Sequence, residues 1–315
     1  MPADAKILQR LRGRIAALER SGNGVRTDDS GEALPFGVAE LDGHLPWGGL
    51  AAGAVHEILD GDLRKIPQKS EKATKYLLKA KHEDGFQGAV TGFAAALAGK
   101  AQAARAAPVV WIAPRLERRE SLYGPGLLEF GLDPANLVVV RIPSGSEFGA
   151  TALWAMEEAL RAPAVGLVCA EIEEMDLTAS RRLQLAAEAG NGLGLLLRRA
   201  PRGAALPPTA SVSRWRVSSL PGSPADEDER LPGRLPGRPR WRAELLRARG
   251  GRPKTWDLEW RDERTDPSRD GDAVGKTAGG FALVPPLRDR PLPQETERKA
   301  PAASRGPGLR RLRSA

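Results

Sequence analysis

The chain has 315 residues, of which 41% are apolar and 28% are charged. This length fits one domain of about 200–250 residues with extensions, or two small domains. The composition supports a hydrophobic core, so we exclude a wholly disordered chain. No apolar run approaches the roughly 20 residues of a membrane-spanning helix, which excludes a membrane-spanning role.

Cysteine and histidine limit the metal chemistry. The single cysteine, Cys169, excludes an intramolecular disulfide and a thiolate metal cluster, and the three histidines lie far apart in the sequence. We therefore expect no metal site. Residues 1–20 lack the continuous apolar stretch and cleavage site of a secretory signal, so we expect a cytoplasmic protein in a reducing compartment.

The net charge of +8 comes mainly from arginine, with 37 Arg and 11 Lys. Two explanations stay open. A GC-rich genome favours arginine codons without any functional reason. Alternatively, the chain binds a polyanion, because arginine pairs with phosphates in bidentate fashion and releases their counterions.

The first expected element is a basic helix over residues 6–20, followed by a polar linker over 21–33. Its apolar side chains recur at alternating spacings of three and four, as on the packed face of a coiled coil. Two heptads are too short for a free coiled coil, so the stripe packs either on its own domain or on a neighbouring protomer. The stripe consists of Leu8, Leu11, Ile15 and Leu18.

Between residues 34 and 196, short apolar runs alternate with alanine-rich stretches. Fully apolar strands that alternate with helices predict an α/β fold with a mostly parallel sheet and helices on both faces. The expected strands cover 54–59, 108–113, 137–141, 165–170 and 192–197. The expected helices cover 91–105, 121–130, 150–161 and 178–189.

After residue 199 the pattern changes to strands separated by a linker. We predict a strand at 213–220, a linker at 221–240, and two strands whose alternate positions from 241 to 245 and from 256 to 260 are apolar. The joint between the last two is a glycine-containing hairpin tip, which is either a solvated turn or a close contact with nucleic-acid phosphates. Its basic residues are Arg247, Arg249, Arg252 and Lys254.

Beyond Trp260 the chain is rich in Pro, Arg and Asp, so residues 261–315 are predicted to form a disordered basic tail. The last 18 residues carry six basic residues and no acid. One short apolar run at 281–284 is a candidate docking peptide. A lysine-rich insert at 61–84 interrupts the core, and its lysines form either a solvated face or a basic surface.

Residues 36–50 (FGVAELDGHLPWGGL) and 53–58 (GAVHEI) have an ordered set of Gly, Leu and Asp positions. This element resembles the opening of the RecA/RadA/KaiC core, where it leads through a strand into the phosphate loop. The resemblance implies a RecA-like fold of the P-loop type. The core is then expected at 34–260.

The phosphate loop itself is degenerate. A working loop has the pattern GxxxxGK[ST], in which backbone N–H groups cradle the phosphates and the lysine reaches the β- and γ-phosphates. Here Gly85 and Gly88 are the candidate remnants, but Ala89 stands in place of the lysine and Val90 in place of the hydroxyl residue. Thr91 comes one position late.

Two further catalytic positions agree with a loss of hydrolysis. The resemblance places a water-activating glutamate at Arg115, and the strand that resembles a Walker B strand ends in Glu171 where the family has aspartate. The GKT at 275–277 does not replace the loop, since its glycine spacing is one residue short and it follows no predicted strand. We therefore expect neither an ATPase nor a bound cofactor.

Four segments narrow the resemblance to the ImuA family, the RecA-like, SulA-related damage-inducible mutagenesis proteins. They are LYGPGLLEFGLDPANLVVV at 122–140, ALWAMEEAL at 152–160, DLTASRRLQLAAEAG at 176–190 and WRAELLRARGGRP at 241–253. The resemblance covers about residues 6–260 apart from the insert.

The resemblance implies a non-catalytic accessory protein of SOS-induced error-prone translesion synthesis, associated with the nucleoid. It also implies the partners, which are an ImuB-like protein related to Y-family polymerases and an error-prone polymerase III alpha-type subunit, with RecA and DNA as further candidates. Two alternatives remain at this point. One is a SulA-like inhibitor of cell division, and the other is a divergent ATPase whose lysine comes from the insert or from a neighbouring protomer.

Overall fold

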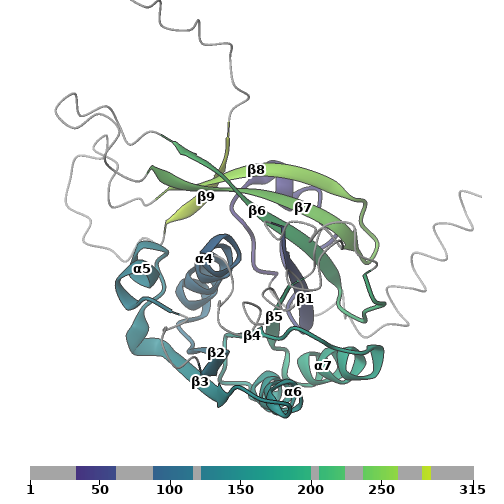
Figure 1. Ribbon diagram of the computed structural model, residues 1–315. Coiled ribbons are helices and arrows are strands. Elements are labelled where there is room, and N and C mark those ends of the chain that lie inside the picture. Colours follow the sequence, from purple (N-terminus) through teal and green to yellow (C-terminus); the bar gives the residue numbers. More distant parts are fainter. Residues whose placement is uncertain are drawn as a thin grey trace, which may run out of the picture. The chain divides into compact units, whose positions relative to one another are not determined.

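The computed structural model describes residues 33–61, 88–115, 122–199, 206–223, 237–261 and 279–284 (Figure 1). Its strands form one nine-stranded sheet in the order β3-β2-β4-β5-β1-β6-β7-β8-β9. The strands are β1 (Ala54–Asp60), β2 (Val109–Arg115), β3 (Leu137–Pro143), β4 (Leu167–Glu171), β5 (Leu193–Arg199), β6 (Ser213–Ser223), β7 (Arg238–Ala248), β8 (Lys254–Arg261) and β9 (Gly280–Leu283). The helices are α2 (Ala39–Asp42), α4 (Gly88–Arg105), α5 (Gly124–Glu129), η1 (Pro134–Asn136), α6 (Phe148–Arg161) and α7 (Leu177–Gly190).

Strands β1 to β5 form the parallel part of the sheet, and β6 continues it in parallel on the other side of β1. Every residue of β1 and β4 is buried, which is why apolar residues in these strands do not alternate with exposed ones. Helices α4 and α5 cover one face, and α6 and α7 cover the other (Figure 1). The predicted α/β class, with a mostly parallel sheet and helices on both faces, is confirmed.

Strands β7, β8 and β9 extend the sheet in antiparallel fashion beyond β6. Their inner face packs on α4 through an aromatic cluster in which ring centroids lie 5.2–6.2 Å apart. Such tilted and edge-on ring pairs add to the gain from burial. The cluster consists of Phe36, Phe93, Phe130, Trp215, Trp241, Trp256, Trp260 and Phe281.

Strand β9 corrects the prediction that the whole chain after residue 260 lacks structure. Residues 280–283 pair with β8, and the Phe281 ring contacts Phe36, Phe93, Trp241 and Trp260. The candidate docking peptide therefore docks on the chain's own sheet, where pairing with β8 and burial of the Phe281 ring both oppose the entropy lost on ordering.

Other predicted segments lie outside the described residues. They include the N-terminal helix with Leu8, Leu11, Ile15 and Leu18, residues 62–84 of the insert predicted at 61–84, and the tail after Val284. Among the described elements, α4 begins at Gly88 instead of Thr91, and α5 covers only the middle of the helix predicted at 121–130.

The entry element at 36–53 is held by its aspartate and two of its glycines. Asp42 accepts hydrogen bonds from the backbone N–H groups of residues 36, 37 and 38 at 2.8, 2.9 and 3.1 Å. A Cβ at Gly49 would lie 2.4 Å from the Leu34 carbonyl oxygen, and Gly53 has a φ of +61°. The residues that suggested a phosphate-loop protein therefore shape the turn into β1.

A buried ion triad joins β5, β1 and β6, and nothing in the sequence analysis anticipated it. The Glu57 carboxylate, which is fully buried, contacts Arg198 Nη1 at 2.5 Å and Arg214 Nε at 2.6 Å. Arg214 also donates to the Pro207 carbonyl at 2.8 Å. The two arginines come from the strands on either side of β1, so one carboxylate joins three strands.

His56, the neighbouring residue, is locked in its neutral form. Its Nε2 lies 3.0 Å from the Ala51 carbonyl, which can only accept, so Nε2 carries the proton and Nδ1 accepts from the Ser213 hydroxyl at 2.6 Å. The same hydroxyl accepts from Trp215 Nε1 at 2.8 Å. Burial lowers the His56 pKa to about 4, which fits this uncharged role.

We predict that Glu57→Gln destabilises the fold by about 3–5 kcal/mol, because it leaves two buried arginines without their carboxylate. Chemical denaturation at neutral pH measures the loss. The matched control is Asp257→Asn, which removes the carboxylate of the exposed Arg242 pair and should cost no more than about 1 kcal/mol. Equal losses in the two variants would contradict the importance of the triad.

Candidate functional site

The carboxyl ends of the parallel strands form the edge where α/β sheets usually bind ligands. β1 ends there at Asp60, β2 at Arg115, β4 at Glu171 and β5 at Arg199. This edge brings together Arg115 and Glu171, the two strand-end residues singled out from the sequence. The first turn of α4 follows β1 after the residues that the structure leaves undescribed.

Glu171 is hydrogen-bonded to the indole ring of Trp111 on the adjacent strand β2. The side chain is buried, and its Oε1 accepts a hydrogen bond from Trp111 Nε1 at 2.9 Å, while Oε2 has no hydrogen-bond partner among the described residues. Burial raises the Glu171 pKa to about 7, against the opposing effects of the Trp111 bond and of Arg199.

The start of α4 presents no positive side chain. Gly88, Ala89, Val90 and Thr91 form its first turn; Val90 is fully buried, and Thr91 is half-buried. The backbone N–H groups of this turn are of the kind that bind phosphate, but no lysine stands among these four residues. Gly85, the other candidate remnant of the loop, lies outside the described residues.

Arg115 is exposed at the end of β2, and its carbonyl accepts a hydrogen bond from the Ser144 hydroxyl at 3.1 Å. A guanidinium stays protonated and has no acceptor, so Arg115 cannot take a proton from an attacking water. Arg115 therefore cannot act as the water-activating base that the resemblance expects at the end of this strand.

The basic hairpin between β7 and β8 forms as predicted, but three of its four cations contact the protein itself. Arg247 lies 3.3 and 3.4 Å from the carbonyls of Thr209 and Ser211, and Arg249 lies 3.4 Å from that of Ala210. Burial, and to a smaller extent Arg247, lower the Arg249 pKa.

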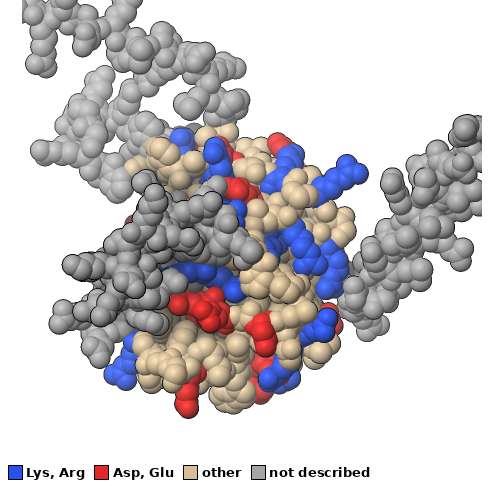
Figure 2. Space-filling view, turned by 45° about the vertical axis from the view of Figure 1, so that its right-hand side comes forward, with Lys and Arg blue, Asp and Glu red and all other residues tan. Residues whose placement is uncertain are grey.

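At the other side of the tip, Lys254 pairs with Glu40 at 2.8 Å and lies over the Trp256 ring, 5.4 Å from its centroid. The Arg252 side chain is exposed, while its carbonyl contacts His44 Nε2 at 2.9 Å. Where side chains are described, Figure 2 shows basic and acidic residues interspersed over one face of the molecule. Contacts with the rest of the protein thus hold the tip in place, and the Arg252 side chain stays exposed.

Among the described residues, no three His, Cys, Asp or Glu side chains gather as a metal site. No described helix is both long and apolar enough to cross a bilayer.

Sequence comparison decides the family. The chain is 36% identical over 233 residues to the protein named ImuA in two strains of Caulobacter vibrioides, NA1000/CB15N and ATCC 19089/CB 15; the match covers 72% of this chain and 82% of each relative. The chain belongs to the ImuA family. This confirms the resemblance seen in the four segments between residues 122 and 253.

Two other comparisons concern the wider relationships of this ImuA family member. The chain matches none of the protein-family models with which it was compared. Among solved structures, a RadB recombinase aligns over 72% of this chain and 95% of its own, with 14% sequence identity and a TM-score of 0.45.

We predict that Glu171→Gln makes stability less dependent on pH. A carboxyl whose pKa is raised on folding binds more protons in the native than in the unfolded state, so its contribution to stability falls as pH rises from about 4.5 to about 7. Glutamine keeps an acceptor for Trp111 but does not ionise. The measurement is the free energy of unfolding by denaturant at pH 5 and at pH 8. Its decrease from pH 5 to pH 8 should be smaller in the variant than in the wild type, by on the order of 3 kcal/mol. Equal pH dependence in both proteins would contradict the buried carboxyl.

Proposed function

We propose that this protein is a non-catalytic RecA-like accessory factor of damage-inducible, error-prone translesion DNA synthesis. The observation that carries the proposal is the 36% identity to ImuA over 72% of the chain.

The absence of hydrolysis is part of the proposal, and three features of the carboxyl edge support it. The first turn of α4 has alanine and valine at the positions of lysine and hydroxyl. Arg115 replaces a base, and Glu171 is hydrogen-bonded to Trp111. Each change alone would slow phosphoryl transfer, because the reaction depends on positioned cations and an oriented water.

In this role the protein is a scaffold. We propose that it assembles with an ImuB-like protein related to Y-family polymerases and with an error-prone polymerase III alpha-type subunit, at sites of damage in the nucleoid. RecA and DNA are further candidate partners. These partners follow from the family and not from any contact in the structure.

The test is affinity purification of the full chain from cells exposed to a DNA-damaging agent, followed by identification of its partners and assay of ATP turnover. We expect the two polymerase-related proteins, and turnover no higher than that of a mock preparation. Recovery of the division tubulin homologue in their place would favour an inhibitor of cell division. Turnover that Glu171→Gln abolishes would establish a divergent ATPase.

DNA binding by the hairpin tip gives a separate prediction. Arg247→Ala combined with Arg252→Ala should weaken duplex binding and flatten its salt dependence, by about 0.9 in the log–log slope for each phosphate that the variant no longer neutralises. The measurement is fluorescence anisotropy with labelled duplex DNA over a series of salt concentrations. Arg242→Ala, which removes an exposed arginine paired with Asp257, is the control. An unchanged slope would show that the tip is a solvated turn that makes no contact with DNA phosphates.

A further inference from the structure

The short strand β9 lies on the edge of the sheet in the way that a separate peptide binds to a sheet edge. Its residues pair antiparallel with β8, and the N–H of Val284 donates to the Asp257 carbonyl at 2.9 Å. β9 is the end strand of the described sheet, and residues 262–278 between β8 and β9 lie outside the described part of the chain (Figure 1). Addition of an extended segment to a sheet edge is a common mode of peptide recognition.

Alternate residues of this segment face the aromatic cluster and define what the site accepts. Phe281 is buried among four rings at centroid distances of 5.2–5.8 Å, and Leu283 packs on the same cluster. At Gly279 a Cβ would lie 2.7 Å from the Arg261 carbonyl oxygen and 2.8 Å from Trp260 Cζ2, so no side chain fits there. The site therefore recognises a glycine, an aromatic residue two positions later and an aliphatic residue two positions after that.

The walls of the pocket around Phe281 are held by contacts that do not involve β9. The rings of Phe93 and Trp241 lie 5.7 Å apart, and Trp260 lies 5.8 Å from Phe130. Trp260 Nε1 also donates to the Glu129 carbonyl at 2.9 Å. Strand β8 itself is paired with β7 along its other edge. We therefore expect the pocket and the β8 edge to keep their form when β9 leaves.

Strand β9 has few buried contacts of its own. Only Phe281 is buried among its four residues, and the other three are partly exposed. Full burial of one phenylalanine side chain contributes about 1.5–3 kcal/mol. Segments with few buried apolar contacts open locally at a lower free energy than the whole domain unfolds. Release of β9 alone is therefore expected to precede unfolding of the sheet.

We propose that the β8 edge and the aromatic pocket form a binding site for an extended segment of another protein, and that β9 is the chain's own competitor for this site. The partner segment pairs antiparallel with residues 257–261. Its aromatic ring takes the place of Phe281, its aliphatic side chain that of Leu283, and its glycine lies against Trp260. The same contacts that bind β9 thus bind the partner.

The connection between β8 and β9 argues against a second copy of this chain as the occupant. A strand joined to its site by a linker as short as residues 262–279 has an effective concentration on the order of millimolar. Exchange of β9 between two copies would reproduce the same contacts and would cost the free motion of one molecule, so it is unfavourable at micromolar protein concentration. A partner segment binds when its contacts exceed those of β9, which sets the affinity that the partner needs.

Hydrogen exchange of the full wild-type chain, followed by mass spectrometry, tests the release of β9. In an antiparallel pair the inter-strand hydrogen bonds alternate, so the N–H of Ala282 points toward β8 like that of Val284. We expect these amides to be at least about 100-fold less protected than those of β7, which is paired on both sides. Equal protection of β9 and β7 would overturn the proposal.

Binding of a second strand is measured by fluorescence anisotropy of the full chain with a labelled peptide that copies residues 278–286 (AGGFALVPP). Two variants release β9 in different ways. Phe281→Ala removes its buried ring, and Ala282→Pro removes an inter-strand N–H while leaving the pocket unchanged. Each should bind the peptide with a Kd on the order of 100 µM. The wild type should bind it at least about tenfold more weakly, because β9 occupies the site.

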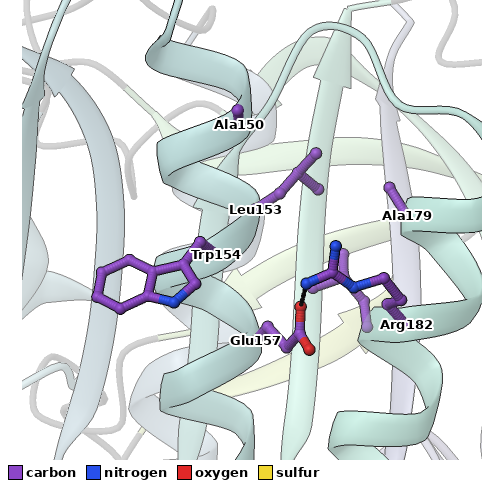
Figure 3. Close-up of a pocket in the computed structure, with 7 residues that line it drawn as sticks. Ala150, Leu153, Trp154, Glu157, Ala179 and Arg182 are labelled. Carbon is purple, nitrogen blue, oxygen red and sulfur yellow. Dashed lines mark hydrogen bonds and ion pairs between the residues drawn. The ribbon is translucent and has the colours of Figure 1, made fainter.

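The control on the chain is Trp154→Ala, which removes an exposed ring on α6. This ring points away from α7 on the other face of the sheet, so the variant should bind the peptide as weakly as the wild type does (Figure 3). The control peptides carry Phe281→Ala or Gly279→Val, and each should bind about tenfold more weakly to the two β9 variants. Circular dichroism verifies that all variants keep the fold.

Three results would overturn the proposal: no peptide binding to either β9 variant, equal binding to the wild type, or equal binding of the control peptides. A wild-type dimer that Phe281→Ala dissociates in sedimentation would assign the site to a second copy and overturn it too.

This inference does not depend on the proposed role in translesion synthesis. The exchange and peptide assays contain no DNA, nucleotide or polymerase. Their failure would therefore leave the family role standing, and failure of the purification from damaged cells would leave the strand-binding site standing.

Discussion

The position of β1 between β5 and β6 is the constraint on which the rest of the structure depends. This strand is buried along its whole length, yet it carries His56 and Glu57, and burying such polar side chains is costly unless they are hydrogen-bonded or paired. Arg198 supplies one from β5 and Arg214 supplies another from β6, while Ser213 satisfies His56. These contacts fix the register of β6 relative to the parallel part of the sheet, and β6 in turn is the strand on which the antiparallel part is built.

The antiparallel part is stabilised in a different way, by aromatic packing in place of ionic contacts. The tryptophans of β6, β7 and β8 face α4 together with Phe36 from the entry element and Phe281 from β9. Rings from near the two ends of the described chain, those of Phe36 and Phe281, thus meet in one cluster. The entry element is therefore part of the packing of the core.

Much of the fold could be predicted from the sequence, because local patterns determine it. The apolar runs placed all five parallel strands, and the alternation from 241 to 260 placed the β7–β8 hairpin. The short run at 281–284 gave too little periodicity to distinguish a strand from a tail, since its stability comes from rings that are distant in the sequence. Likewise the partners of Glu57 lie 141 and 157 residues away, and no spacing rule connects such positions.

The candidate site shows the same division. The substitutions at Ala89, Val90 and Arg115 can be read residue by residue, because the resemblance fixes what each position should hold. The contact between Glu171 and Trp111 could not be predicted from the sequence, since it depends on the pairing of β2 with β4. The contacts of Arg247 and Lys254 with loop carbonyls and Glu40 were also beyond the pattern, which showed only a cluster of positive charge.

The ion triad also bears on how such a chain can diverge. Replacing Glu57 alone leaves two buried guanidinium groups without a counter-ion. Replacing Arg198 or Arg214 alone leaves the buried Glu57 carboxylate with one ion-pair partner instead of two. An apolar version of the same core would need all three positions to change, and each intermediate would be less stable than either end state. Divergence at these sites should therefore be concerted, with the three identities inherited or lost as a set even where the surrounding leucines and valines exchange freely.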